Sequence, residues 1–220
     1  MGRTKEWALE LQMEEDKLRE LDYLYEQYEA EMKWFNEHPS LETYSIFTEK
    51  LKQLKSMVSR EHDQFDAEMF QKMAYVHAVT LFEAMVGDVI KATILAFPNL
   101  MNRMVNKLGE DKSRKFQLKE IAELGLNGIV LGILNGQLYH NPVTVRYFVS
   151  IITGKPLDER YMAAMQSVTV KRHDLVHRDG KTINDEPHLI DQAAVNTCIE
   201  VIENFANDIF QSLVVAMKEP

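Results

Sequence analysis

Residues 191–213, DQAAVNTCIEVIENFANDIFQSL, decide the fold class of this chain. Their large apolar residues recur every three or four positions, at Val195, Ile199, Ile202, Phe205, Ile209 and Leu213. This spacing predicts a helix with one apolar face, and Asp191 is placed to cap its first turn. Other long segments show the same periodicity and no strand pattern competes with it, so we predict an all-α protein.

Proline and glycine residues divide the rest of the chain into further predicted helices. Proline stops a helix and glycine favours its end. The predicted helices cover residues 66–97, 118–138 and 142–153, and a fourth begins after Asp158, a candidate cap, and ends at Gly180. The helix over 118–138 carries four glycines on one face, which favours close packing against another helix over a subunit interface. These are Gly125, Gly128, Gly132 and Gly136.

The N-terminal region has heptad spacing, in which apolar residues alternate three and four positions apart. Two such runs cover residues 18–35 and 44–65, with a break at Pro39. This spacing is typical of helices that pack along a narrow seam. We therefore predict an antiparallel, coiled-coil-like helical hairpin over residues 1–66, followed by a helical domain over residues 67–220. The sequence leaves open whether the hairpin projects from that domain or folds back onto its core.

The acidic charge of the chain is concentrated in this N-terminal region. The formal net charge is -9, and residues 1–68 hold 9 Lys or Arg against 17 Asp or Glu. An acidic chain is unlike a general nucleic-acid coat protein, whose affinity comes from neutralising phosphates. The nearly neutral remainder can still contain a local basic pocket. We therefore expect the N-terminal helices to contact a protein partner rather than RNA.

Cysteine content and hydropathy indicate the compartment. The single cysteine, Cys198, cannot form an internal disulfide, and no Cys or Cys/His grouping has zinc-finger spacing. The sequence opens with charged residues rather than an apolar signal segment. No later stretch has the roughly 18 uninterrupted apolar residues that a membrane span needs. These features predict a cytoplasmic protein with no membrane partner.

Residues 171–181, KRHDLVHRDGK, combine the side chains suited to phosphate chemistry. They contain four cations and two histidines together with two carboxylates. Histidine readily accepts and donates protons near neutral pH, and arginine offers a planar, permanently charged fork to phosphate oxygens. This combination can move protons around a phosphodiester without a metal ion.

The motif resembles the signature of the HEPN superfamily, whose members are all-helical domains and in many cases metal-independent endoribonucleases. The resemblance rests on Arg172, the polar His173 directly after it, and His177 after four intervening residues, and Lys181 matches an extended form of the signature. A helix around residues 75–84 and a closing helix after the motif follow the family order, so the resemblance covers roughly residues 70–215. It implies a HEPN-like helical bundle that cleaves RNA to 2′,3′-cyclic phosphate ends. Toxins and phage-defence effectors are among such enzymes, and neither a cofactor nor a metal is implied.

The resemblance also implies a role for each motif residue. His177 is the expected general acid or base, Arg172 is expected to stabilise the charge of the pentacoordinate phosphorus, and His173 to orient the phosphate or assist proton transfer. Arg178 and Lys181 are expected to anchor flanking phosphates of the RNA substrate.

The spacing of Arg172 and His177 raises a geometric problem. On one regular helix they leave the axis about 140° apart. Either the helix unwinds near Gly180, or two copies of the motif helix meet across a twofold axis and share each site. The family resemblance favours a homodimer, which is also the commonest assembly.

The sequence leaves several alternatives open. Arg172 and His177 could be ordinary cations at a helix end, where the helix dipole favours them. His173 and His177 have the spacing to bind a metal ion, although no third ligand is evident nearby. Asp174 is interpreted as an exposed helical carboxylate in preference to one that orients a histidine. The alternative function is a non-catalytic HEPN-like module that binds a nucleotide or a protein partner.

Overall fold

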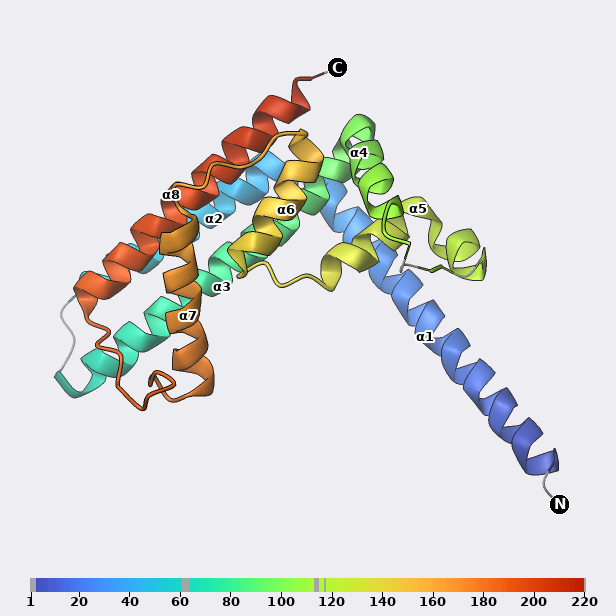
Figure 1. Cartoon of the computed structure of the whole chain (residues 1–220), viewed down its shortest axis with the longest axis horizontal. Helices are drawn as coiled ribbons and strands as arrows, with labels where there is room; N and C mark the ends of the chain where they lie inside the picture. Colours follow the sequence, from blue (N-terminus) through green and yellow to red (C-terminus); the bar gives the residue numbers. More distant parts are fainter. Residues whose placement is uncertain (1–2, 61–63, 113–114, 117, 220) are drawn as a thin grey trace.

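The computed structural model describes residues 3–60, 64–112, 115–116 and 118–219, which contain eight helices (Figure 1). These are α1 (Arg3–Glu37), α2 (Ser40–Val58), α3 (Gln64–Ala96), α4 (Pro98–Gly109), α5 (Leu118–Asn135), α6 (Pro142–Thr153), α7 (Met162–His177) and α8 (Gln192–Met217). The described ranges contain no strand, and an isolated antiparallel bridge joins Lys181 to Pro187. The predicted all-α class is confirmed. None of the described helices has the length and apolar content needed to cross a bilayer.

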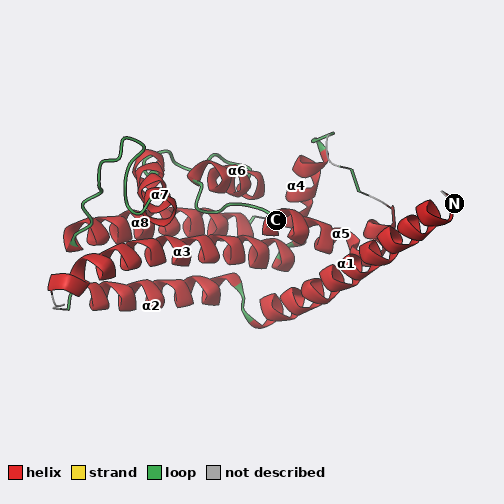
Figure 2. Ribbon diagram, turned by 90° about the horizontal axis from the view of Figure 1, so that it is seen from below, coloured by secondary structure: helices red, strands yellow, loops and turns green. Residues whose placement is uncertain are grey.

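The core lies where α2, α3 and α8 run side by side, and α6 and α7 cover one face of this layer (Figure 2). Phe82 of α3 and Phe205 of α8 are fully buried, with their ring centroids 5.7 Å apart. Tyr44 of α2 stacks on Phe210 of α8 at 4.1 Å. Each amphipathic helix thus removes its apolar stripe from water, which is the main force holding the bundle together.

The two N-terminal helices pack against different parts of the molecule instead of forming the predicted antiparallel hairpin. The chain bends at Pro39, and α2 then packs on α3 and α8. Its heptad residues Phe47, Leu51, Leu54 and Val58 are buried in the main core. By contrast, α1 contacts α5 and α3, and its N-terminal half projects from the bundle (Figures 1 and 2). The predicted boundary at residue 66 therefore falls close to the start of α3, between two helices that share one core.

Side-chain caps explain where several helices begin. The Asn141 side chain accepts the backbone N–H of Val143 at 3.0 Å at the start of α6. Asp191 accepts the N–H of Ala194 at 2.7 Å, so the predicted cap of α8 is confirmed. The prediction for Asp158 is wrong. Its carboxylate accepts the N–H of Arg160, and α7 begins later, at Met162, because this turn intervenes.

The glycines of α5 have separate roles. Gly125 interrupts the helix with φ 63° and ψ -177°, a backbone conformation that is favourable only without a Cβ. Gly128 lies beside Tyr28 of α1, and a Cβ added there would be 3.5 Å from the tyrosine ring. Gly132 has open space around it. Close packing through glycine is therefore found at Gly128 and not along the whole predicted face.

Candidate functional site

The motif residues lie in the last turns of α7, where this helix crosses α3 toward one end of the bundle (Figure 1). Met165, Val168 and Thr169 are buried and hold α7 on the bundle. The helix is regular through His177, and Arg178 is its C-cap. The motif side chains therefore project from a rigid element, which is what a site of defined geometry requires.

His173 and His177 form an exposed pair on α7. Their ring centroids lie 4.7 Å apart and the ring planes are inclined at 46°. This proximity follows from the four-residue spacing, because side chains at positions i and i+4 lie one above the other on a helix. Two adjacent imidazoles that solvent can reach are able to accept one proton and donate another within a single bound substrate.

Arg172 is set more deeply than the histidine pair. Its side chain is partly buried, and its Nε atom is shielded from solvent without a hydrogen-bond partner. A buried N–H without an acceptor costs free energy. The helix does not unwind between Arg172 and His177, because the first left-handed residue is Asp179 with φ 53°. The two side chains thus leave one continuous helix about 140° apart.

Asp174 is buried, which contradicts the prediction of an exposed helical carboxylate. It is 3% exposed and accepts two side-chain hydrogen bonds. Nη1 of Arg178 lies 2.6 Å from Oδ1, and Nε2 of His188 lies 2.8 Å from Oδ2. The bond from His188, followed by the bond from Arg178, lowers the pKa of the Asp174 carboxyl from its usual range. Asp174 therefore orients a histidine, but the histidine is His188 and not a member of the exposed pair.

A short hairpin after α7, over residues 179–188, buries the Asp174 side chain. The left-handed residues Asp179 and Gly180 turn the chain back, and the N–H groups of Arg178 and Gly180 both donate to the Asp174 carbonyl at 3.0 Å. The His188 N–H then donates to the Gly180 carbonyl at 2.8 Å, which closes the hairpin. The hairpin carries His188 over the carboxylate of Asp174 and fixes the end of α7.

The two predicted phosphate anchors are engaged in ion pairs within the chain. The Arg178 side chain pairs with Asp174, as described, and Nζ of Lys181 lies 2.8 Å from Oδ1 of Asp185. The Arg178 side chain is 41% exposed and that of Lys181 is 45% exposed. Both cations are therefore accessible to solvent near the histidine pair, but each already has a carboxylate partner.

Two residues near the motif were not identified from the sequence. His188 comes from the hairpin, and Lys72 comes from α3. A Cβ added to Gly180 would lie 3.7 Å from the Nζ of Lys72, which also pairs with Glu68 at 2.7 Å. No local pattern could reveal Lys72, because about a hundred positions separate it from the motif.

Other titratable groups lie outside the motif residues. His140 Nδ1 is 2.9 Å from the carboxylate of Glu83, a pair that links the α5–α6 connection to α3. Cys198 is buried beside Tyr75, and burial raises the pKa of its thiol to about 12. No group of three or more His, Cys, Asp or Glu side chains within the described ranges has an arrangement that could hold a metal ion.

No protein-family model, curated protein or solved structure matches this chain.

Proposed function

We propose that this chain is a metal-independent endoribonuclease with a HEPN-like helical bundle. The observation that carries the proposal is the exposed pair of His173 and His177, whose rings lie 4.7 Å apart on the helix that also carries Arg172. Paired imidazoles supply the two proton transfers that phosphodiester cleavage requires, and a guanidinium supplies the positive charge. In a cell, such an enzyme would act on cytoplasmic RNA, as toxins and phage-defence effectors do.

The proposed reaction is an internal transesterification. The ribose 2′-oxygen attacks the adjacent phosphorus while one imidazole accepts the 2′-hydroxyl proton. The bond between phosphorus and the 5′-oxygen breaks, and an imidazolium protonates that leaving oxygen. The products are a 2′,3′-cyclic phosphate and a free 5′-hydroxyl. His177 is the principal acid or base, His173 assists the second transfer, and Arg172 stabilises the added charge on phosphorus.

The cations around the motif supply a substrate-binding surface in this proposal. Lys72 of α3 lies beside Gly180, which is flanked along the chain by Arg178 at the end of α7 and Lys181 in the hairpin. RNA phosphates would compete with Glu68, Asp174 and Asp185 for these side chains. Of the three acids, Asp174 is buried, so we expect Arg178 to stay with Asp174 and the two lysines to contribute more to RNA binding.

A homodimer is part of the proposal because Arg172 and His177 do not point the same way from one α7 helix. Two α7 helices that meet across a twofold axis would place Arg172 of one chain near His177 of the other. Apolar side chains near the motif could form the contact. Val170 and Val176 of α7 and Ile183 and Leu189 of the hairpin are between 45% and 84% exposed.

The decisive experiment is cleavage of single-stranded RNA in EDTA, with analysis of the product ends. We expect cyclic phosphate ends, and we expect His177→Ala to lower the rate by about a hundredfold or more. His77→Ala is the matched control, because it removes an exposed histidine of α3 that has no assigned role. A strict requirement for a divalent ion, or full activity in the double variant of His173 and His177, would refute the mechanism.

The dimer has its own test. Arg172→Ala and His177→Ala are each expected to be inactive, whereas a mixture of the two proteins should recover part of the activity, since one shared site would again be complete. Sedimentation at micromolar concentration should show a dimer. A monomer at that concentration would contradict shared sites.

One observation favours a second candidate, a non-catalytic HEPN-like module that binds a nucleotide or a protein partner. Arg178 and Lys181 are both paired with carboxylates of the same chain, which reduces the positive charge offered to a polymer. Nucleotide binding without turnover, unchanged by His177→Ala, would support this candidate.

A further inference from the structure

The N-terminal half of α1 presents an apolar seam that is exposed from Trp7 to Leu18. Trp7, Leu11, Leu18 and Leu21 follow heptad spacing and so lie on one side of the helix. Trp7 is 63% exposed, Leu11 39% and Leu18 44%. This half of α1 extends away from the bundle (Figure 1). These exposed apolar side chains form a continuous row instead of a single isolated residue. Their spacing is that of a surface on which a second helix packs.

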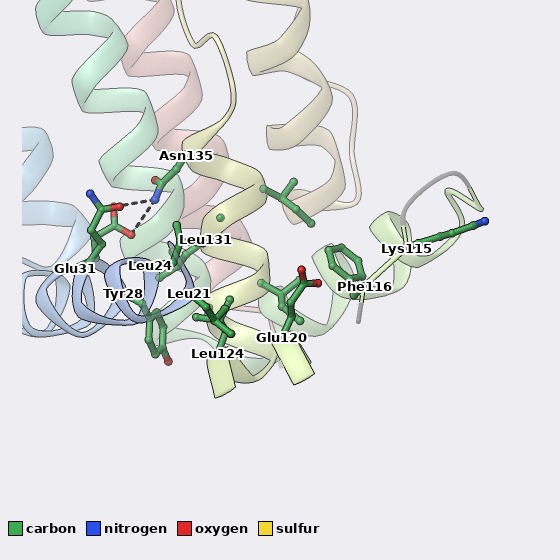
Figure 3. A pocket seen from close by; sticks show the side chains of 15 residues that line it. Leu21, Leu24, Tyr28, Glu31, Lys115, Phe116, Glu120, Leu124, Leu131 and Asn135 are labelled. Atoms are coloured by element: carbon green, nitrogen blue, oxygen red, sulfur yellow. Dashed lines mark hydrogen bonds between the residues drawn. The ribbon is translucent and has the colours of Figure 1, made fainter. Parts of the chain in front are cut away.

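The other half of the same seam already binds a helix within the chain. Tyr28, seven positions after Leu21, packs beside Gly128 of α5. Glu31 accepts two hydrogen bonds from the amide nitrogen of Asn135, each 3.0 Å long (Figure 3). The intramolecular contact shows that this side of α1 accommodates a second helix.

A groove continues from this contact onto the uncovered half. Between α1 and α5 lies a cavity of about 370 Å³, whose lining includes Leu21, Leu24, Leu124 and Leu131 (Figure 3). Further hollows follow along α1, first between Leu18 and the N-terminal turn of α5, and then beside Leu11 and Trp7. The segment from Trp7 to Leu21 is about 21 Å long, enough for four turns of a partner helix.

Charge determines which occupant suits this groove. α1 contains 11 Asp or Glu against five Lys or Arg. Glu14 occupies the seam position between Leu11 and Leu18 and lines both outer hollows, as does Lys17 from outside the seam. Two copies of α1 would oppose two strongly acidic helices, and RNA or an anionic membrane would meet the same repulsion. A basic helix with an apolar stripe matches both the seam and the charge.

We propose that residues 7–21 of α1 bind a basic amphipathic helix of a partner protein, with a Lys or Arg of that helix opposite Glu14. A single charged pair inside an otherwise apolar seam would fix the register of the two helices. The proposal is independent of the ribonuclease activity, because none of the residues involved belongs to the histidine site.

The test uses a synthetic helical peptide of about 18 residues, with leucines at heptad core positions, lysines at the flanking positions and one lysine opposite Glu14. A second peptide has the same leucines and glutamates in place of the lysines. Trp34→Phe leaves Trp7 as the single tryptophan of the full chain, which has two. We expect the basic peptide to shift Trp7 emission to shorter wavelength as the indole leaves water, and the acidic peptide to have no effect.

Two aspartate substitutions in α1 form a matched pair. Leu11→Asp changes the seam, whereas Leu9→Asp makes the same change on the opposite side of the helix, where Leu9 is 60% exposed. We expect Leu11→Asp to weaken peptide binding by about tenfold or more and Leu9→Asp to leave it unchanged. Glu14→Gln should weaken binding of the basic peptide and reduce its sensitivity to salt.

Three outcomes would overturn the proposal. Equal binding of the basic and acidic peptides would show that charge does not select the partner helix. Equal effects of Leu11→Asp and Leu9→Asp on peptide binding would show that the peptide does not bind along the seam. Self-association of the peptide-free protein that Leu11→Asp abolishes would assign the seam to a second copy of the chain.

Discussion

Replacing Leu51 by alanine should destabilise the whole bundle, because α2 belongs to its core. Leu51 has no exposed surface and lies in the main cluster of buried side chains. A leucine-to-alanine change at such a position costs about 2–5 kcal/mol, since it removes buried methyl groups and leaves a cavity. For a chain of this size, that loss corresponds to a fall in Tm on the order of 10 °C.

Leu41→Ala is the matched control for this experiment. It makes the same chemical change in the same helix, but Leu41 is 68% exposed. Its effect on the free energy of unfolding should stay within about 0.5 kcal/mol. Guanidinium unfolding followed by circular dichroism would measure both variants. A loss below about 1 kcal/mol for Leu51→Ala would refute the placement of α2 in the core.

Truncation of the N-terminal region should show how much α1 and α2 each contribute to the stability of the bundle. The four buried apolar side chains of α2 together contribute roughly 6–12 kcal/mol, which is comparable to the entire stability of a typical domain. Removal of residues 1–66 should therefore abolish cooperative unfolding. Removal of residues 1–20 should change Tm by no more than about 2 °C, because the side chains described there are exposed. Cooperative melting after the longer deletion would restore the two-part organisation predicted from the sequence.

Three further predictions follow from individual residues. The hydrogen bonds from His188 and Arg178 lower the pKa of Asp174, so this carboxylate stabilises the fold above its ordinary pKa and the contribution is lost as pH falls through the lowered value. Guanidinium unfolding at about pH 7 and about pH 3 should show a smaller acid-induced loss for Asp174→Asn than for the unmodified chain. Gly125→Ala should cost about 1–3 kcal/mol because φ 63° with ψ -177° is a region that essentially only glycine adopts, whereas an alanine at the helical Gly132 should be neutral or stabilise by up to about 1 kcal/mol. Burial raises the pKa of Cys198 to about 12, so its thiol should not react with a disulfide reagent at about pH 8 until denaturant unfolds the bundle.

Helical periodicity predicted the elements well because it depends on local geometry. The apolar stripe of α8 and its Asp191 cap are both found in the structure. Periodicity says which face of a helix is buried, but it does not say what buries it. The heptads of α1 and α2 look alike in sequence, yet those of α2 face the main core and those of α1 face α5, α3 or solvent. The partner of each face is set by contacts between distant parts of the chain.

Asp174 shows a second limit of local patterns. Its neighbours on the helix gave no reason to expect burial, because the hairpin that covers it folds back from beyond the end of α7. His188 reaches the carboxylate from fourteen positions away. The spacing of residues along a helix does not distinguish a polar side chain that a loop covers from one that solvent reaches. Spacing alone therefore predicted that Asp174 is exposed, although it is buried.

α3 is the element through which the two proposed functional surfaces of this chain could communicate. Lys72, near one end of α3, lies beside Gly180 at the histidine site. Lys91, further along the same helix, donates a hydrogen bond to Asn135 at 2.9 Å and pairs with Glu31 of α1 at 3.5 Å. The two lysines are about 28 Å apart along a continuous helix, which transmits rigid-body movement but offers no hinge. A partner bound to α1 could therefore change the geometry of the histidine site through α3 only by moving α3 as a whole. The many buried contacts of α3 with α2 and α8 oppose such movement, so we expect α1 to act as a tether that places the proposed histidine site near its partner rather than as a switch.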